Sequence, residues 1–338
     1  MKKLIFTFIL IAITLTACGR NNTQNEVLTR PQRPTQQFDI LTPFEIPQET
    51  KDGSHIHGFL SRIEYGENAA YIIGSMHLGR PDWFPLAPMV QEAKSRSDIF
   101  AFEVDFGLMD ETEVADHMMQ FAVLPDNQTL KDFLPDDVFN HFYAMIETFP
   151  NITFEMLERF TPAFASYFIA LVEAMPLMGV ETDYSVDMHI MDFAKDNNKP
   201  VIGLNDIFRE FDLTFDWPKE VQISALAEFA DFETFAEEVS EMGLADAYDA
   251  QDAEWIYREA ILPLRESAEE SVYGQFMFDS ILLERCVIFA EEIERLLRET
   301  EEPTTFFITI GAAHVLFGYI FDMLQDNGLE VVSLWKDA

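Results

Sequence analysis

The chain has 338 residues, of which 60 are acidic and 22 are basic, so its formal net charge at pH 7 is −38. A negative field of this size disfavours nucleic acids and anionic substrates as partners, and no local cluster of lysine and arginine reverses it. We therefore expect no binding of nucleic acid, and we interpret the acidic helical segments as a solvated surface.

The first residues predict a targeting signal rather than a part of the fold. Lys2 and Lys3 precede an apolar run from Leu4 to Ile13, which is too short to span a membrane as a mature helix. The next tetrapeptide, Leu15-Thr16-Ala17-Cys18, resembles a bacterial lipobox. The resemblance implies that residues 1–17 are removed as a lipoprotein signal peptide and that the Cys18 thiol is lipidated. The alternative is an ordinary signal peptide with an incidental cysteine.

Lipidation of Cys18 would anchor the protein on the extracytoplasmic side of a bacterial membrane, at the cell surface or facing the periplasm. Residues 18–50 are rich in Asn, Gln, Thr and Pro and lack apolar periodicity, which predicts a flexible tether. Residues 51–338 are then enough for one folded domain with a sizeable core. Cys286 is the only other cysteine, so the mature chain would have neither an intramolecular disulfide nor a cysteine metal cluster.

A short apolar strand followed by a glycine turn is the central motif of the folded part. Ala69–Ile73 predicts a buried strand, and Gly74-Ser75-Met76-His77 follows it directly. The run Ile56–Tyr65 precedes this strand across a short turn, which predicts a hairpin. Ligands of open α/β sheets bind beyond the carboxyl ends of the strands, so His77 is placed where sites are commonly built.

The same motif recurs more than two hundred residues later. Thr305–Ile310 predicts a second buried strand, and Gly311-Ala312-Ala313-His314 follows it. Two such turns could place His77 and His314 at one edge of one sheet. The alternative is that each histidine only caps its own turn by bonding to nearby backbone groups.

The remaining pattern is typical of an α/β protein. We expect a central mixed, largely parallel sheet of about six strands, with flanking helices and a large helical insertion. The further elements predicted are a helix in Pro85–Ser97, a strand in Ile99–Asp105, helices between Asp110 and Met175 including Asp136–Thr148 and Pro162–Met175, a helix in Asp183–Ala194, a strand in Lys199–Leu204, helices from Pro218 to Arg298 with a break near Pro263, a helix in Val315–Asn327 and a strand in Leu329–Leu334.

Two charged residues stand inside apolar surroundings. Glu103 lies near the end of the strand Ile99–Asp105, where burial of a carboxylate requires a metal, a cation or a hydrogen-bond donor. Arg285 lies on a helix among Leu282, Leu283 and Ile288, which predicts a buried arginine with a carboxylate partner. The two could form a structural ion pair, or both could belong to a functional site.

An ordered set of motifs resembles the TraB/GumN family over residues 56–336. That family is related to the Tiki metal-dependent peptidases and, more distantly, to erythromycin esterases and ChaN-like haem-binding lipoproteins, so residues 51–338 would form a TraB/GumN-like domain. The motifs are Gly74-Ser75-Met76-His77, Phe102-Glu103-Val104-Asp105, Gly179 through Asp187 to Ala194, Lys199-Pro200-Val201-Ile202-Gly203-Leu204, Glu284-Arg285, Gly311-Ala312-Ala313-His314 and Gly328.

The resemblance implies which residues form the site. His77, His314 and Glu103 match the family's metal or catalytic centre, which would hold a divalent ion such as zinc, manganese or cobalt, and Arg285 matches its late arginine. Cys286 stands where the family usually has asparagine, and Asn205 where many members have glutamate. Three further candidates for supporting the site are Asp187, Asn205 and Asp206.

Two functions remain open from the sequence. The first is a membrane-anchored, metal-dependent hydrolase, in which two imidazoles and a carboxylate leave coordination positions for water and for a peptide or protein substrate. The second is a non-catalytic lipoprotein that uses the same histidines to bind and sequester a peptide or haem. Neither a His-Glu-x-x-His helix nor a Gly-x-Ser-x-Gly elbow is present.

Overall fold

The computed structural model describes residues 56–104, 111–125, 127–174, 180–228 and 243–335. The predicted signal peptide, the tether and Cys18 lie outside these residues. In the described part, no helix is both long enough and apolar enough to cross a membrane.

A single six-stranded sheet organises the molecule. Four neighbouring strands are parallel, while β1 runs antiparallel to both β2 and β6. The mixed, largely parallel sheet expected from the sequence is therefore confirmed, although β6 extends it beyond the hairpin. In spatial order the strands are β4 (Val201–Asn205), β3 (Ile99–Val104), β5 (Thr305–Gly311), β2 (Asn68–Ser75), β1 (Ser61–Tyr65) and β6 (Glu330–Ser333).

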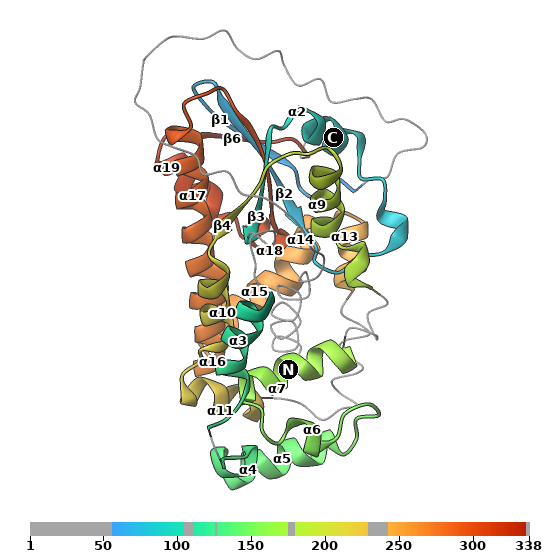
Figure 1. Cartoon of the computed structure of the whole chain (residues 1–338), viewed down its shortest axis with the longest axis vertical. Coiled ribbons are helices and arrows are strands. Elements are labelled where there is room, and N and C mark those ends of the chain that lie inside the picture. Colours follow the sequence, from blue (N-terminus) through green and yellow to red (C-terminus); the bar gives the residue numbers. More distant parts are fainter. Residues whose placement is uncertain (1–55, 105–110, 126, 175–179, 229–242, 336–338) are drawn as a thin grey trace.

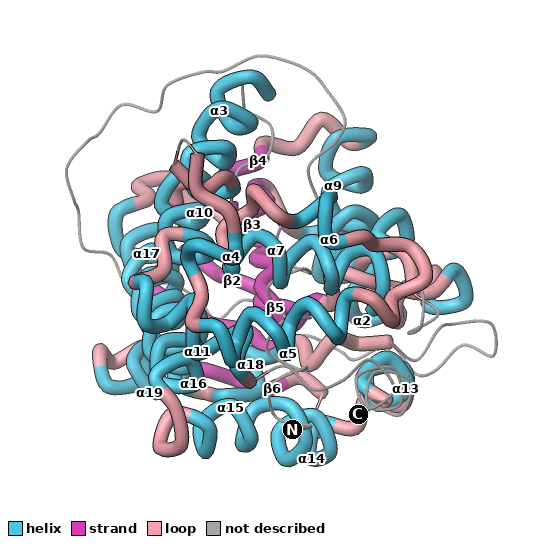
Figure 2. The backbone as a smooth tube through the Cα atoms, turned by 90° about the horizontal axis from the view of Figure 1, so that it is seen from below, coloured by secondary structure: helices cyan, strands magenta, loops and turns pink. Residues whose placement is uncertain are grey.

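Helices cover both faces of this sheet (Figure 1). The helices α17 (Arg285–Glu299) and α19 (Tyr319–Asp326) lie along one side, and α2 (Pro88–Arg96) and α9 (Val186–Asp196) lie along the other. Seen from below, the strands run through the middle of the molecule with helices around them (Figure 2). Apolar runs such as Ile72-Ile73 in β2 are buried on both faces, which is the pattern of strands in a covered parallel sheet.

The helical insertion extends from one end of the sheet (Figure 1). Its outermost part is made of short helices from the middle of the chain, and a second group leads back to the sheet through α17. The elements are α3 (Glu111–Ala122), α4 (Leu130–Phe133), α5 (Asp136–Ile146), α6 (Phe154–Leu157), α7 (Pro162–Ile169), α10 (Ile207–Phe215), α11 (Lys219–Ala227), α13 (Leu244–Asp249), α14 (Ala253–Ile256), α15 (Leu262–Ser267) and α16 (Val272–Phe276).

Two predicted elements are interrupted where the backbone departs from regular geometry. The run Ile56–Tyr65 forms strand only from Ser61, because Gly58 and Phe59 both have positive φ angles of 55°. A Cβ at Gly58 would overlap the Ile73 side chain. The helix expected in Val315–Asn327 is split at Gly318, whose φ of 81° separates α18 (Ala312–Phe317) from α19.

Three stretches of helix take the wider π-helical turn, and one of them precedes the break that the sequence predicts near Pro263. The segments η2 (Ala170–Ala174), η4 (Tyr257–Ile261) and η5 (Met277–Glu284) are π-helical. The chain therefore passes Pro263 without leaving the helix, since η4 runs directly into α15. Two of these segments, η4 and η5, lead to residues beside the pocket described below, which is a common position for π-helical turns.

Candidate functional site

The two glycine turns lie side by side at the carboxyl ends of β2 and β5. These strands are parallel neighbours, and their register pairs Gly74 with Ile310 and Ser75 with Gly311. A Cβ on Gly74 would lie only 3.0 Å from the Ala312 Cα atom, so glycine allows the start of α18 to approach β2 closely. This close packing brings the segments that carry His77 and His314 together.

His77 is held by a carboxylate from α9. Its Nδ1 atom lies 2.8 Å from Asp187 Oδ2, while its Nε2 atom lies 3.8 Å from Glu103 Oε2. Ser185 caps α9 by accepting a hydrogen bond from the Met188 N–H, which fixes the turn that carries Asp187. Burial alone would lower the pKa of His77, but the negative charges of Asp187 and Glu103 outweigh it and raise the pKa to about 9.

Glu103 lies in β3 with both carboxylate oxygens engaged. Oε2 accepts a 2.5 Å hydrogen bond from Arg285, and Oε1 accepts a 2.6 Å bond from the Gly311 N–H. Burial acts to raise the pKa of Glu103, but Arg285 and the nearby histidines lower it to about 2. The carboxylate is therefore ionised across the physiological pH range.

Arg285 is the first residue of α17 and only 1% of its surface is exposed. Its Nη2 atom lies 2.5 Å from Glu103 and 2.9 Å from Glu210 Oε1, so it bridges two buried carboxylates. Burial acts to lower the pKa of Arg285, but Glu210 and Glu103 more than offset this and raise it. The expected ion pair with Glu103 is therefore present, and it lies beside His77 and His314. His77, Glu103, Glu210, Arg285 and His314 are called the cluster below.

His314 lies in α18 and is 2% exposed. Its Nδ1 atom contacts the Cys286 sulfur at 3.2 Å. Burial and the charge of Arg285 lower the pKa of His314 to about 3, so the ring is neutral at physiological pH. Burial raises the pKa of the Cys286 thiol, which makes it an unreactive neighbour of the imidazole rather than a nucleophile.

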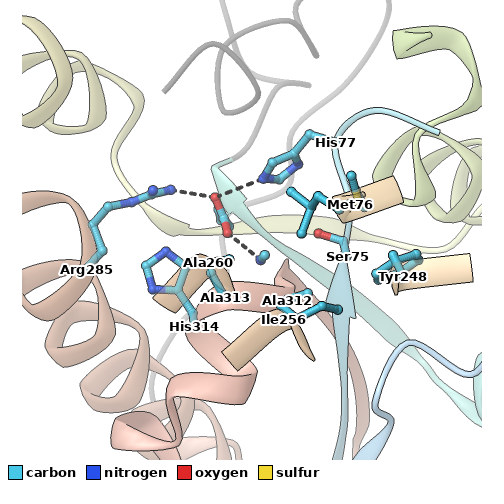
Figure 3. Close-up of a pocket in the computed structure, with 13 residues that line it drawn as sticks. Ser75, Met76, His77, Tyr248, Ile256, Ala260, Arg285, Ala312, Ala313 and His314 are labelled. Atoms are coloured by element: carbon cyan, nitrogen blue, oxygen red, sulfur yellow. Dashed lines mark hydrogen bonds and ion pairs between the residues drawn. The ribbon is translucent and has the colours of Figure 1, made fainter. Parts of the chain in front are cut away.

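The three predicted metal ligands converge around Gly311. A Cβ at this glycine would lie 3.3 Å from Glu103 Oε1, 3.7 Å from His77 Nε2 and 3.7 Å from His314 Cδ2. Figure 3 shows Arg285, His77 and His314 around the same carboxylate. The absence of a side chain at Gly311 therefore leaves a small space that all three residues border.

The remaining predicted residues take different places. Asn205 donates a 3.0 Å hydrogen bond to Glu210 Oε2, so it contacts the cluster at Glu210 rather than at the predicted metal ligands. Asp206 caps α10 by accepting bonds from the Phe208 and Arg209 N–H groups, and it makes no described contact with the cluster.

Glu210 is the charged residue of the cluster that the sequence interpretation missed. It is 2% exposed, and burial raises its pKa against the opposing effect of Arg285. Its α10 position shares a helical face with the buried Thr214, so helical periodicity carried a signal for its burial.

A pocket opens beside the cluster, with an empty volume of about 570 Å³ including its opening to solvent. His77, Glu103, Arg285 and His314 line it, and Ser75 adds a hydroxyl group, while most other lining residues are apolar. Tyr248 lines it as well, but the Tyr248 hydroxyl already donates a 2.8 Å hydrogen bond to the Gly74 carbonyl. The apolar lining residues are Met76, Leu244, Ile256, Ala260, Ala312 and Ala313.

The charge states of the cluster match those of metal ligands in part. His314 is neutral and Glu103 ionised, as ligands must be, and the contact of His77 Nδ1 with Asp187 leaves Nε2 directed towards Glu103. In the described residues, no group of three His, Cys, Asp or Glu side chains is already spaced as a metal site. His77 would also have to lose a proton on binding, and Glu103 would share its oxygens with Arg285 and Gly311.

Comparison with known proteins matches residues 59–333 to the model of the TraB/PrgY/gumN family. No curated protein and no solved structure gives a significant match. The match spans both glycine turns and every residue of the cluster.

Proposed function

Because this chain belongs to the TraB/PrgY/gumN family, we propose that the cluster around Gly311 is the active site of a divalent-metal-dependent hydrolase acting on peptide bonds. The observation that carries this proposal is the convergence of His77 Nε2, Glu103 and His314 on one small space. Two nitrogen donors and one oxygen donor suit zinc, manganese or cobalt and leave coordination positions for substrate.

The surrounding residues would prepare these ligands. Asp187 orients the His77 ring and selects the nitrogen that faces the space. Arg285 keeps Glu103 ionised despite its burial and fixes its direction, while Glu210 contacts the same Nη2 atom of the guanidinium. A divalent ion would supply positive charge that polarises a carbonyl group and activates water for attack.

The substrate and the location belong to the same proposal. The apolar pocket beside the cluster offers room for part of a peptide or secreted protein. The lipobox-like Leu15-Thr16-Ala17-Cys18 supports anchoring by an N-terminal lipid on the extracytoplasmic side of the membrane.

Metal content tests the proposal directly. The purified full-length chain is loaded with zinc, manganese or cobalt, dialysed and assayed by elemental analysis beside His77→Ala and His314→Ala variants. We expect one equivalent of metal in the parent and less than about a tenth of it in either variant, because each removes a ligand. Cleavage of a peptide library should then be lost with a chelator and return with one metal.

A matched variant separates ligand loss from general damage. His117→Ala removes a histidine that pairs with Asp212 on the helical insertion and does not touch the cluster, so its metal content should equal that of the parent. Absence of bound metal from the parent under all three conditions would exclude the hydrolase. A Soret band on addition of haemin to that metal-free chain would instead favour a haem-sequestering lipoprotein.

A further inference from the structure

The pocket beside the cluster is chemically divided. At one end lie His77, Glu103 and Arg285, and the opposite wall consists of apolar side chains from two distant parts of the chain. Leu244, Ile256 and Ala260 come from α13, α14 and η4, while Ala312 and Ala313 begin α18. The reaction proposed above requires the charged end and leaves open which part of the peptide the apolar wall receives.

Small side chains leave the space open at this wall. Ala260 and Ala312 both face the pocket, and η4 packs directly on α18. Ala260, Ala312 and Ile256 appear together below the charged residues in Figure 3. Larger residues at the two alanine positions would fill the same space, so the pocket exists because these positions are small.

Outside the charged end, the pocket offers few partners to a polar group. Ser75 is the one further polar side chain beside Tyr248 among the residues that line it, and its hydroxyl is buried. The Tyr248 hydroxyl is committed to the Gly74 carbonyl, so the ring contributes an apolar surface. A charged or amide side chain placed against Leu244 and Ile256 would lose its hydration without compensation. An aliphatic side chain would instead be removed from water at no polar cost.

We propose that this wall is a subsite for one aliphatic side chain of the substrate, of the size of leucine or methionine, held next to the bond presented to the cluster. The inference rests on the proposed function for the identity of the reacting bond. The wall is formed by a few side chains, three of which are alanines, so it has room for one side chain of a ligand rather than for a long acyl chain. The substrate is therefore a peptide with an aliphatic residue adjacent to the scissile bond.

Binding measured without turnover tests the subsite. Ligand-observed NMR compares two blocked tripeptides, acetyl-Ala-Leu-Ala-amide and acetyl-Ala-Asn-Ala-amide, on the metal-free full-length chain. We expect the leucine peptide to bind at least about tenfold more tightly, as is usual for apolar pockets that distinguish side chains. Ala260→Leu should abolish this preference, whereas Ala250→Leu at the exposed end of α13 should keep it.

A second variant shows whether Ala260→Leu acts by filling the pocket or by damaging the fold. Ile256→Ala enlarges the wall and should move the preference from leucine towards phenylalanine at the same position, which a damaged fold would not do. Equal binding of the two peptides, or no detectable binding of either, would overturn the subsite. Selective leucine binding by a chain that takes up no metal would reject the hydrolase while supporting the subsite.

Discussion

Asp187 connects helix α9 to the histidine that follows β2. Its carboxylate lies 2.8 Å from His77 Nδ1 and is the strongest of the influences that raise the pKa of His77. Burial acts in the opposite direction, so the charge state of His77 depends mainly on this contact, to which the charge of Glu103 adds. The sequence offered Asp187 only as a candidate for supporting the site, since a first-turn acid on a helix also has a purely local role.

Asp187→Asn should lower the pKa of His77 from about 9 to below its ordinary value of about 6.5 in the metal-free protein. The amide keeps the shape but loses the negative charge, so burial then dominates over the remaining attraction of Glu103. At pH 7.5 the ring should be protonated in the parent and neutral in the variant. An NMR titration of the His77 ring protons measures this.

Asp206→Asn provides the control for this titration. Asp206 is also a carboxylate at a helix start, but it caps α10 and does not touch the cluster. The His77 titration should be the same in this variant as in the parent. An unchanged His77 titration in Asp187→Asn would show that Asp187 does not set the charge of the ring.

The site residues at strand ends were the ones that could be predicted from the sequence. His77, Glu103 and His314 each end or follow an apolar strand, and parallel strands bring such ends to one edge. The position of Glu210 in the site could not be predicted in this way. It lies on a helix and contacts Arg285 only because α10 packs near the start of α17. Proximity of that kind depends on tertiary structure, which no local pattern specifies.

At the scale of elements, the sequence predicted which helices and strands exist better than it predicted where they begin and end. Apolar runs identified the central strands β2, β3 and β5 most clearly, because the sheet is covered on both faces there and these strands are almost fully buried. The π-helical turns η4 and η5 were not predicted, since a single additional residue in a helix leaves the apolar period almost unchanged. Yet these turns carry Ala260 to the pocket and lead to Arg285.

A buried lysine lies between α2 and α9. Lys94 is 1% exposed and lies 4.5 Å from the centre of the Phe193 ring, with no carboxylate partner among the described residues. Burial lowers the pKa of Lys94 to about 8, and its charge in turn helps to lower the pKa of His189 to about 4. The contact with the Phe193 ring offsets only part of the cost of burying a cation.

Lys94→Met should therefore raise the free energy of unfolding at pH 7 by about 1–2 kcal/mol, because it keeps the stem and removes the buried charge. Between about pH 8 and the unfolded-state pKa of about 10.4, folded Lys94 is neutral while unfolded Lys94 is protonated. In this pH range the unfolded state binds more protons than the folded state, so the free energy of unfolding of the parent rises with pH. The difference in the free energy of unfolding between the variant and the parent therefore becomes smaller.

Urea unfolding at pH 7 and pH 9.5 measures both effects. Lys195→Met is the matched control, since Lys195 is exposed near the end of α9, and it should change the free energy of unfolding by less than about 0.5 kcal/mol at either pH. A Lys94→Met variant less stable than the parent at pH 7 would mean that the ring contact outweighs the cost of burial.

At the scale of the whole molecule, the spatial order of the strands was the feature that the sequence predicted least well. Strand β5 lies between β2 and β3, although more than two hundred residues separate it from them along the chain. The doubled glycine turn suggested that β2 and β5 are neighbours, and the structure confirms it. Nothing local indicated that β6 would pair with β1 and extend the sheet.

The net charge of −38 is a property of the whole chain and sets its response to salt. The 60 acidic side chains outnumber the 22 basic ones, so their mutual repulsion disfavours the compact state and is weakened by added ions. The buried contacts of Arg285 with Glu103 and Glu210 are shielded from solvent, so their strength should change little with salt concentration.

We therefore expect the Tm at pH 7 to rise by several degrees when sodium chloride increases from about 0.01 M to 0.5 M, a range over which the screening length falls from about 30 Å to a few ångströms. Circular dichroism during heating measures the change. At pH 5, where many carboxylates approach protonation, the same increase in salt should have a smaller effect. A Tm that rises equally at both pH values would attribute the stabilisation to a general salting effect on apolar burial rather than to screened repulsion.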